Sequence, residues 1–192
     1  MKRLAIIFPG IIYNADRPLL YYSRKIAERS GYETEIVRYS GFPKKEKGVT
    51  KIMPETFMTG LAQAKEFLAG LSLAPYEDIL FIGKSIGTMI AAELAARSPV
   101  RDKVRIIAYT PVEKTFSNPL RDAVVFTGSG DPWVGGEASP VPAICAAQDI
   151  PCFVIPDANH ALETDDPLTD VRNLQEIMER TAAFIRKEPL RS

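Results

Sequence analysis

The chain has 192 residues, 46% of them hydrophobic and 25% charged, which is ordinary for a single soluble globular domain spanning residues 1–192. Its 24 basic residues balance its 24 acidic ones, so charge gives no reason to expect nucleic acid or a membrane surface as a partner. The two cysteines, Cys145 and Cys152, lack CxxC spacing, and the chain has no second histidine for a metal site. We therefore expect reduced thiols, a cytoplasmic location, and no metal or cofactor.

The sequence alternates between apolar stretches of strand length and helical segments. In chain order, strands are predicted at residues 3–8, 33–39, 78–83, 104–109, 122–128 and 151–156. Most are continuous apolar runs, as burial on both faces of a parallel sheet requires. The stretch 33–39 instead alternates, as an edge strand with one exposed face does.

Helices are predicted between these strands. The first opens at Asp16 and Pro18 and ends at Gly31, and the others cover Phe57 to Leu71, 86–98, part of 139–148, and a segment from about Asp170. The inner face of the last helix is predicted to carry Val171, Leu174, Met178, Thr181 and Ile185. This alternation predicts a three-layer, doubly wound α/β fold around a mainly parallel six-stranded sheet.

The sequence Gly83-Lys84-Ser85-Ile86-Gly87 fits the pattern G-x-S-x-G between a predicted strand and a predicted helix. That context is the one a nucleophile elbow requires, a sharp turn that holds a serine out of the sheet. We predict a positive φ at Ser85, and glycine at 83 and 87 because a Cβ at either position would collide with a neighbouring strand or helix. The alternative is a glycine-rich helix start whose serine only caps the helix. The spacing does not match a phosphate-binding loop.

The only histidine of the chain, His160, follows the last predicted strand. Ligands and reacting groups in parallel sheets lie beyond the carboxyl ends of the strands, which is where both Ser85 and His160 are predicted to lie. Because a serine hydroxyl needs a base to become a good nucleophile, we expect His160 to be that base. A surface or packing role is the alternative for a lone histidine.

A carboxylate is then needed to orient the imidazole, and Asp131 follows the fifth predicted strand. It gives the chain order Ser, Asp, His, although Gly-Asp-Pro is also a good turn sequence. The main rival is Glu113, after the fourth strand. The remaining candidates, Asp157, Glu163 and Asp165, are close to His160 in sequence and are not preferred.

Acyl transfer also needs donors for a developing oxyanion. One is expected to be the backbone N–H of Ile86 at a helix start, and the other that of Ile11 or Gly10, after the first strand. Four further side chains in the same set of loops are candidates for substrate contact, with loop packing as the alternative: Tyr13, Tyr109, Trp133 and Val134. The lysines within residues 42–51 are interpreted as a solvated loop, with attraction of anionic substrates as the alternative.

With Ser85, Asp131 and His160 placed after the appropriate strands, the chain resembles the α/β-hydrolases over nearly its whole length. It is most similar to their small, single-domain branch related to dienelactone hydrolases and small carboxylesterases. The resemblance implies a strand order of 2-1-3-4-5-6. The connection 110–121 is too short for a lid domain. Two departures are a first loop that reads "FPGI" instead of HG or HGGG, and a serine where dienelactone hydrolases use cysteine.

The resulting hypothesis is a serine hydrolase that cleaves small carboxylic esters or thioesters through an acyl-enzyme, with Ser85, His160 and Asp131 as its triad. Two alternatives remain open. One is a binding or scaffold protein that keeps the fold without turnover, and the other is a small serine peptidase. The sequence indicates neither the natural substrate nor the oligomeric state.

Overall fold

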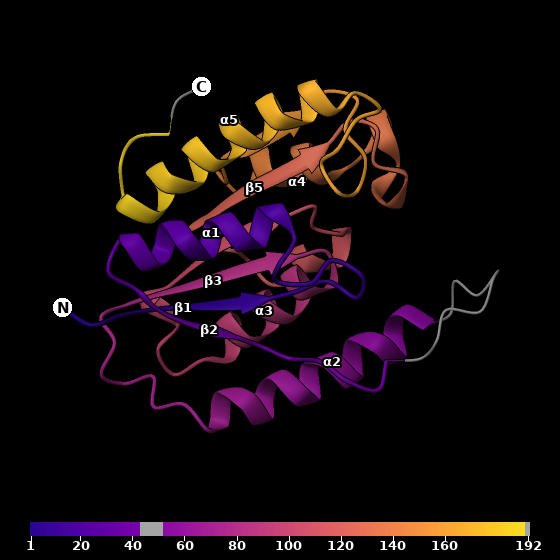
Figure 1. Cartoon of the computed structure of the whole chain (residues 1–192). Helices are drawn as coiled ribbons and strands as arrows, with labels where there is room; N and C mark the ends of the chain where they lie inside the picture. The colour runs from indigo at the N-terminus through magenta and orange to yellow at the C-terminus, as the bar shows by residue number, and fades with distance from the viewer. Residues whose placement is uncertain (43–51, 191–192) are drawn as a thin grey trace.

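The structure is a computed structural model that describes residues 1–42 and 52–190. Its centre is one sheet in which every pairing of neighbouring strands is parallel (Figure 1). The strands are β1 (Arg3–Phe8), β2 (Glu33–Ile36), β3 (Asp78–Lys84), β4 (Val104–Tyr109), β5 (Ala123–Gly128) and β6 (Cys152–Ile155). Their order, β2-β1-β3-β4-β5-β6, confirms the order that the resemblance implied.

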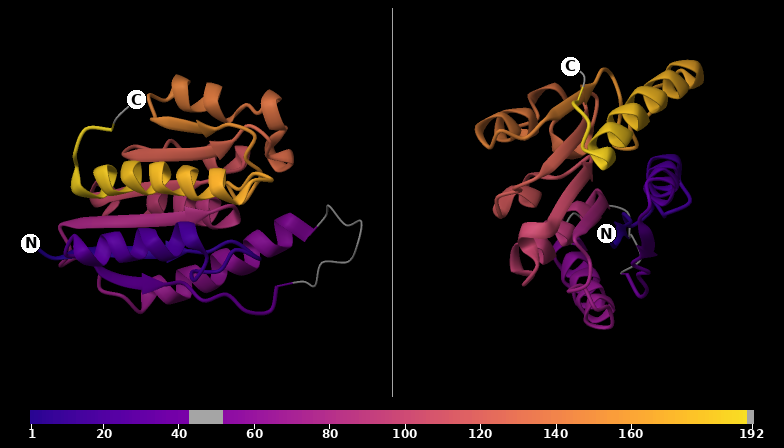
Figure 2. Two further views of the ribbon diagram at one scale, coloured as in Figure 1. Left: turned by 45° about the horizontal axis from the view of Figure 1, so that its top comes forward. Right: turned by 90° about the vertical axis from the view of Figure 1, so that its left-hand side faces the viewer.

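Helices cover both faces of the sheet, so the fold has three layers (Figure 2). The α-helices are α1 (Pro18–Arg29), α2 (Ile52–Ala69), α3 (Ile86–Arg97), α4 (Val141–Ala147) and α5 (Pro167–Arg186). Short 3₁₀-helices lie at η1 (Arg101–Lys103), η2 (Glu113–Ser117), η3 (Pro132–Val134) and η4 (Gly136–Ala138). In the connection between β4 and β5, η2 is the one helix, so no lid domain stands there.

Each face of the sheet has its own hydrophobic core. One core joins the sheet to α1 and α5, and the other joins it to α2, α3 and α4. Alternate residues of one strand serve the two cores: on β1, Ala5 and Ile7 belong to the first and Leu4, Ile6 and Phe8 to the second. This two-sided burial explains why the strands are continuous apolar runs.

Two details of the predicted elements were wrong at their ends. Asp16 does not cap α1, whose N-cap residue is Arg17 and whose first helical residue is Pro18. The edge strand β2 ends at Ile36 instead of residue 39. The lysine-rich loop prediction for residues 42–51 falls almost entirely outside the described residues.

The last helix begins earlier than predicted. Asp166 is its N-cap, and the Asp166 carboxylate accepts hydrogen bonds from the backbone N–H groups of Leu168 and Thr169. The inner face is carried by Ile177, Thr181, Phe184 and Ile185, whereas Val171 is 64% exposed. The prediction for Val171 was therefore wrong.

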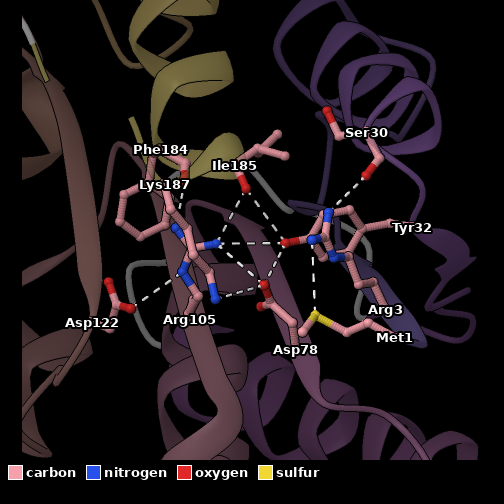
Figure 3. Close-up of polar contacts among 10 residues, drawn as sticks. All are labelled: Met1, Arg3, Ser30, Tyr32, Asp78, Arg105, Asp122, Phe184, Ile185 and Lys187. Atoms are coloured by element: carbon pink, nitrogen blue, oxygen red, sulfur yellow. Dashed lines mark hydrogen bonds and ion pairs between the residues drawn. The ribbon is translucent and has the colours of Figure 1, made fainter. Parts of the chain in front are cut away.

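At the amino edge of the sheet, where the N-terminal ends of its strands lie, a cluster of charged side chains holds the C-terminal end of α5 in place (Figure 3). Arg105 of β4 donates hydrogen bonds to the carbonyl oxygens of Phe184 and Ile185, and its guanidinium lies 3.8 Å from the Asp78 carboxylate of β3. Asp78 also accepts a hydrogen bond from the Tyr32 hydroxyl at 2.9 Å. The side chains of Arg105 and Asp78 are almost wholly buried, so this cluster holds charges that water does not screen.

Candidate active site

Ser85 lies in the sharp turn between β3 and α3, at the carboxyl edge of the sheet. Its φ is 55° and its ψ is −122°, which confirms the positive φ predicted for it. Such a conformation is strained for a residue with a side chain, so it persists only where the surroundings enforce it. Here the Ser85 N–H donates to the Tyr109 carbonyl at 3.0 Å, which ties the turn to the end of β4.

The glycines of the turn are required by close backbone contacts. A Cβ on Gly87 would lie 2.0 Å from the carbonyl oxygen of Phe8, and one on Gly83 would lie 2.8 Å from the Cα of Thr88. The first contact lets α3 approach the end of β1, and the second lets β3 turn directly into α3. The steric reason predicted for both glycines is confirmed.

Three side chains from distant parts of the chain form one hydrogen-bonded row. His160 Nε2 lies 2.8 Å from Ser85 Oγ, and His160 Nδ1 lies 2.7 Å from Asp131 Oδ2. An ionised carboxylate can only accept hydrogen bonds, so the proton of the neutral imidazole lies on Nδ1 and Nε2 accepts from the serine hydroxyl. The structure therefore brings together the three residues that the sequence singled out.

Asp131 is fully buried and held by more than the imidazole. Its second carboxylate oxygen, Oδ1, accepts a hydrogen bond at 3.0 Å from the N–H of Trp133 and so caps η3. The rival carboxylate Glu113 lies in η2, exposed. The geometry thus favours Asp131 as the partner of His160.

The loop that carries His160 is shaped by its own hydrogen bonds. The side chain of Asn159 accepts from the N–H of Ala161 at 2.7 Å, and the Asn159 N–H donates to the Glu163 carbonyl at 2.8 Å. A Cβ on Gly128, at the end of β5, would lie 2.0 Å from the Ala158 carbonyl oxygen. This contact seats the loop against β5 and so brings His160 beside Asp131.

Burial lowers the pKa of His160, although the neighbouring Asp131 acts in the opposite direction. A positive charge on Lys84 lowers the same pKa further. The imidazole is therefore neutral, and able to accept a proton, over a wider range of pH than an ordinary histidine.

Among the three predicted oxyanion donors, Gly10 differs from the others because its N–H already has a hydrogen-bond partner. The Gly10 N–H donates to the Tyr13 carbonyl at 3.0 Å, which occupies it. Gly10 nonetheless lies against Ser85, because a Cβ placed on it would be 3.5 Å from the Ser85 Cβ. Ile86 is the first residue of α3, and N–H groups in the first turn of a helix have no partner within that helix.

The four side chains predicted to contact substrate fall into two groups. Trp133 is 53% exposed, and its indole lies 5.6 Å from the imidazole of His160. Tyr13 and Val134 are buried among other apolar side chains. The prediction for Tyr109 was wrong, because its side chain is fully buried under α1 and α5, where its hydroxyl contacts Ser23 Oγ at 2.8 Å and Thr181 Oγ1 at 2.5 Å.

One residue of this region was not singled out from the sequence. Lys84, the residue before Ser85, is 1% exposed, and its ammonium donates a hydrogen bond at 2.7 Å to the carbonyl oxygen of His160. A lysine inside an otherwise apolar buried strand was the signal that could have indicated it, because lysine is almost never fully buried.

Within residues 1–42 and 52–190, no group of three histidine, cysteine or acidic side chains is placed to hold a metal ion. No helix in those residues combines the length and apolar character needed to cross a membrane. Both described cysteines carry free thiols.

Comparison with family models gives no match for this chain, and comparison with curated protein sequences gives none either. Solved structures do match over nearly its whole length. An α/β serine hydrolase homologue from Coxiella burnetii is similar, with a TM-score of 0.63 and 18% identity over 97% of this chain and 84% of that one. The chain has the α/β-hydrolase fold.

Two other structures with the α/β-hydrolase fold have comparable similarity. An α/β serine hydrolase without a lid, from Xanthomonas campestris, gives a TM-score of 0.65 with 14% identity over 96% of this chain and 81% of that one. Est1E from Butyrivibrio proteoclasticus, in a complex with ferulic acid, gives a TM-score of 0.67 with 16% identity over 97% of this chain and 89% of that one. These three structures, which include a serine hydrolase and a serine hydrolase homologue, share this chain's architecture.

Proposed function

We propose that the protein is a serine hydrolase that cleaves small carboxylic esters or thioesters. The observation that carries this proposal is the row from Ser85 Oγ through His160 to Asp131, with hydrogen-bond distances of 2.8 and 2.7 Å, at the carboxyl edge of a parallel sheet. Nucleophilic acyl transfer by a serine requires a hydroxyl, a base and an orienting carboxylate, hydrogen-bonded in this order.

In the proposed reaction, His160 Nε2 takes the proton of Ser85 as Oγ attacks the carbonyl carbon of the substrate. Asp131 stabilises the imidazolium, which then gives its proton to the leaving alcohol or thiol and leaves an acyl-enzyme. Water, activated by the same imidazole, releases the carboxylic acid. No cofactor takes part in these steps.

The oxyanion is proposed to be bound by the backbone N–H of Ile86, whose place at the start of α3 adds the favourable end of a helix dipole. Ile11 is the first-loop candidate for the second donor, because the Gly10 N–H already donates to Tyr13. Trp133 is proposed to contact the substrate, since its exposed indole lies beside His160. No lid domain stands between β4 and β5, which fits small substrates that approach directly from solvent.

The test is covalent labelling by a fluorophosphonate probe together with hydrolysis of p-nitrophenyl esters of increasing chain length. Wild type should be labelled, and Ser85→Ala should not, with kcat lower by several orders of magnitude. Ser129→Ala is a matched control, because Ser129 also follows a strand of the sheet but donates no hydrogen bond to His160 in the structure; its Oγ accepts from the Asp157 N–H. Equal labelling of wild type and Ser85→Ala would contradict the proposal.

A further inference from the structure

Lys84 stands next to the proposed nucleophile, but its side chain does not face the solvent. It is among the largest fully buried side chains of the structure. A buried ammonium is costly unless hydrogen bonds and opposite charges compensate for the lost hydration. What surrounds Lys84 therefore indicates what this residue is for.

The ammonium group joins segments that follow three different strands. It donates to Thr110 Oγ1 at 2.5 Å, just after β4, and to the His160 carbonyl at 2.7 Å, after β6. It also lies 5.1 Å from the centre of the Tyr13 ring, after β1. One cation thus connects the loops around Ser85.

Thr110 is held in place for this contact. Its φ is 44°, an outlier for a β-branched residue, and its N–H donates to the Phe126 carbonyl at 2.7 Å. Strain of this kind is retained where the surrounding structure enforces it, often near functional sites. Tyr13 is fixed as well, since its hydroxyl accepts from the Leu19 N–H at 3.0 Å.

We propose that Lys84 is a positioning residue, which fixes the backbone of His160 within reach of Ser85 and places a buried amine that can carry a positive charge near the imidazole. This inference rests on the function proposed above and adds a residue to its machinery. Lys84 does not touch the reacting atoms, and it acts through His160.

The charges around Lys84 support the electrostatic part. Burial lowers the pKa of Lys84 to about 7, the carboxylates of Asp131 and Glu163 act against that change, and the charge of Arg17 adds to it. In the more acidic range where His160 would take up a proton, Lys84 is therefore charged. Its charge is one of the causes that lower the pKa of His160.

His160 is the one histidine of the sequence, so NMR can follow the titration of its imidazole unambiguously. This measurement does not depend on enzymatic activity. Lys84→Met removes both the charge and the hydrogen bonds, whereas Lys84→Gln removes the charge but keeps a donor, one bond shorter in reach. In both variants the pKa of His160 should rise by about half a pH unit or more. Lys103→Met is the matched control, because Lys103 also donates to two backbone carbonyls but stands at the opposite edge of the sheet. It should leave the titration unchanged.

Steady-state kinetics of the two variants separates the effect of the hydrogen bonds of Lys84 from the effect of its charge. Lys84→Met should lower kcat about 10- to 100-fold with little change in KM, because a misplaced base affects the reaction more than substrate binding. Lys84→Gln should recover part of that loss while keeping the raised pKa of His160. If Lys84→Met fails to fold, the titration and kcat of Lys84→Gln decide alone.

An unchanged titration of His160 together with an unchanged kcat in the Lys84 variants would overturn the inference. If wild type is still labelled at Ser85 in that case, the proposed function stands. Wild type that is not labelled at Ser85 would overturn both.

Discussion

Each of the three aligned side chains handles a proton differently. In the proposed reaction Ser85 would give one up, His160 would carry it, and Asp131 would hold the imidazole in the tautomer that can accept it. Asp131 is fully buried and also caps η3, so its position does not depend on the imidazole alone. Substituting it therefore tests the tautomer more than the geometry.

Asp131→Asn should keep the fold but reverse the hydrogen bond to His160, because an amide can donate to Nδ1. The proton would then lie on Nε2, which could no longer accept from Ser85. We expect kcat to fall by about 10³- to 10⁴-fold. Steady-state hydrolysis of a p-nitrophenyl ester measures this, and a loss below tenfold would assign the orienting role elsewhere.

The pH dependence follows from the lowered pKa of His160. In the proposed reaction the imidazole must be neutral, so we expect activity to be complete above this pKa and to be lost as pH falls through it. Because burial lowers the pKa, the acid limb of kcat/KM should lie below about 6.5, the ordinary value for histidine. A pH profile with an acid limb at or above 7 would contradict this.

The sequence did not predict which aromatic side chains near the site are exposed. Tyr109 at the end of β4 and Trp133 in the segment after β5 are both aromatic residues, and composition does not distinguish them. Tyr109 is the last residue of β4 and points under α1 and α5, whereas Trp133 lies in η3, beyond β5, and is half exposed. The face on which a side chain emerges is set by strand register and loop shape, which the sequence does not specify.

Among elements, the turn between β3 and α3 leaves no room for side chains at its two glycines. Its glycines lie against backbone atoms, which cannot move aside as the end of a side chain can. This part of the site was predictable, because the motif and its place between a strand and a helix already imply the crowding. The start of α5 was less so, since Asp166 and Asp170 are both plausible caps.

Gly87→Ala should separate α3 from β1, because the added Cβ would lie 2.0 Å from the Phe8 carbonyl oxygen. We expect the free energy of unfolding to fall by about 3 kcal/mol or more. Gly70→Ala is the control, since the nearest atom to its Cβ would be the Phe67 carbonyl oxygen at 3.4 Å, and it should change stability by less than about 1 kcal/mol. Urea unfolding of both variants makes the comparison, and equal midpoints would contradict it.

At the scale of the whole molecule, the carboxyl ends and the amino ends of the strands carry different groups of side chains. The carboxyl edge carries Ser85 and His160, while the amino edge carries the buried cluster around Arg105 and Asp78 (Figure 3). The layers and the side of the sheet on which the site lies were predictable from the alternation of elements. The cluster was not, because Arg105 stands alone in an apolar strand and its partners are distant in sequence.

Arg105→Met should destabilise the protein without impairing the chemistry. The Asp78 carboxylate and the carbonyls of Phe184 and Ile185 would lose a buried donor, and we expect a cost of about 3 kcal/mol. Activity per folded molecule should stay within about twofold. Thermal unfolding together with labelling of Ser85 by the probe measures both.

The control for Arg105→Met is Arg121→Met, which breaks an exposed ion pair with Asp102 and should cost less than about 0.5 kcal/mol. Loss of labelling in folded Arg105→Met would show that the two edges are coupled.

The span of 75 residues between Ser85 and His160 has a consequence for synthesis on the ribosome. A nascent chain exposes its serine, with the whole turn around it, long before the loop that holds the imidazole has been translated. On the proposed function, Ser85 would become reactive only after strands β4, β5 and β6, which lie between it and His160 in the chain, have been added to the sheet. Acquisition of probe reactivity during translation or refolding would therefore mark the arrival of the loop after β6, not the formation of the turn around Ser85.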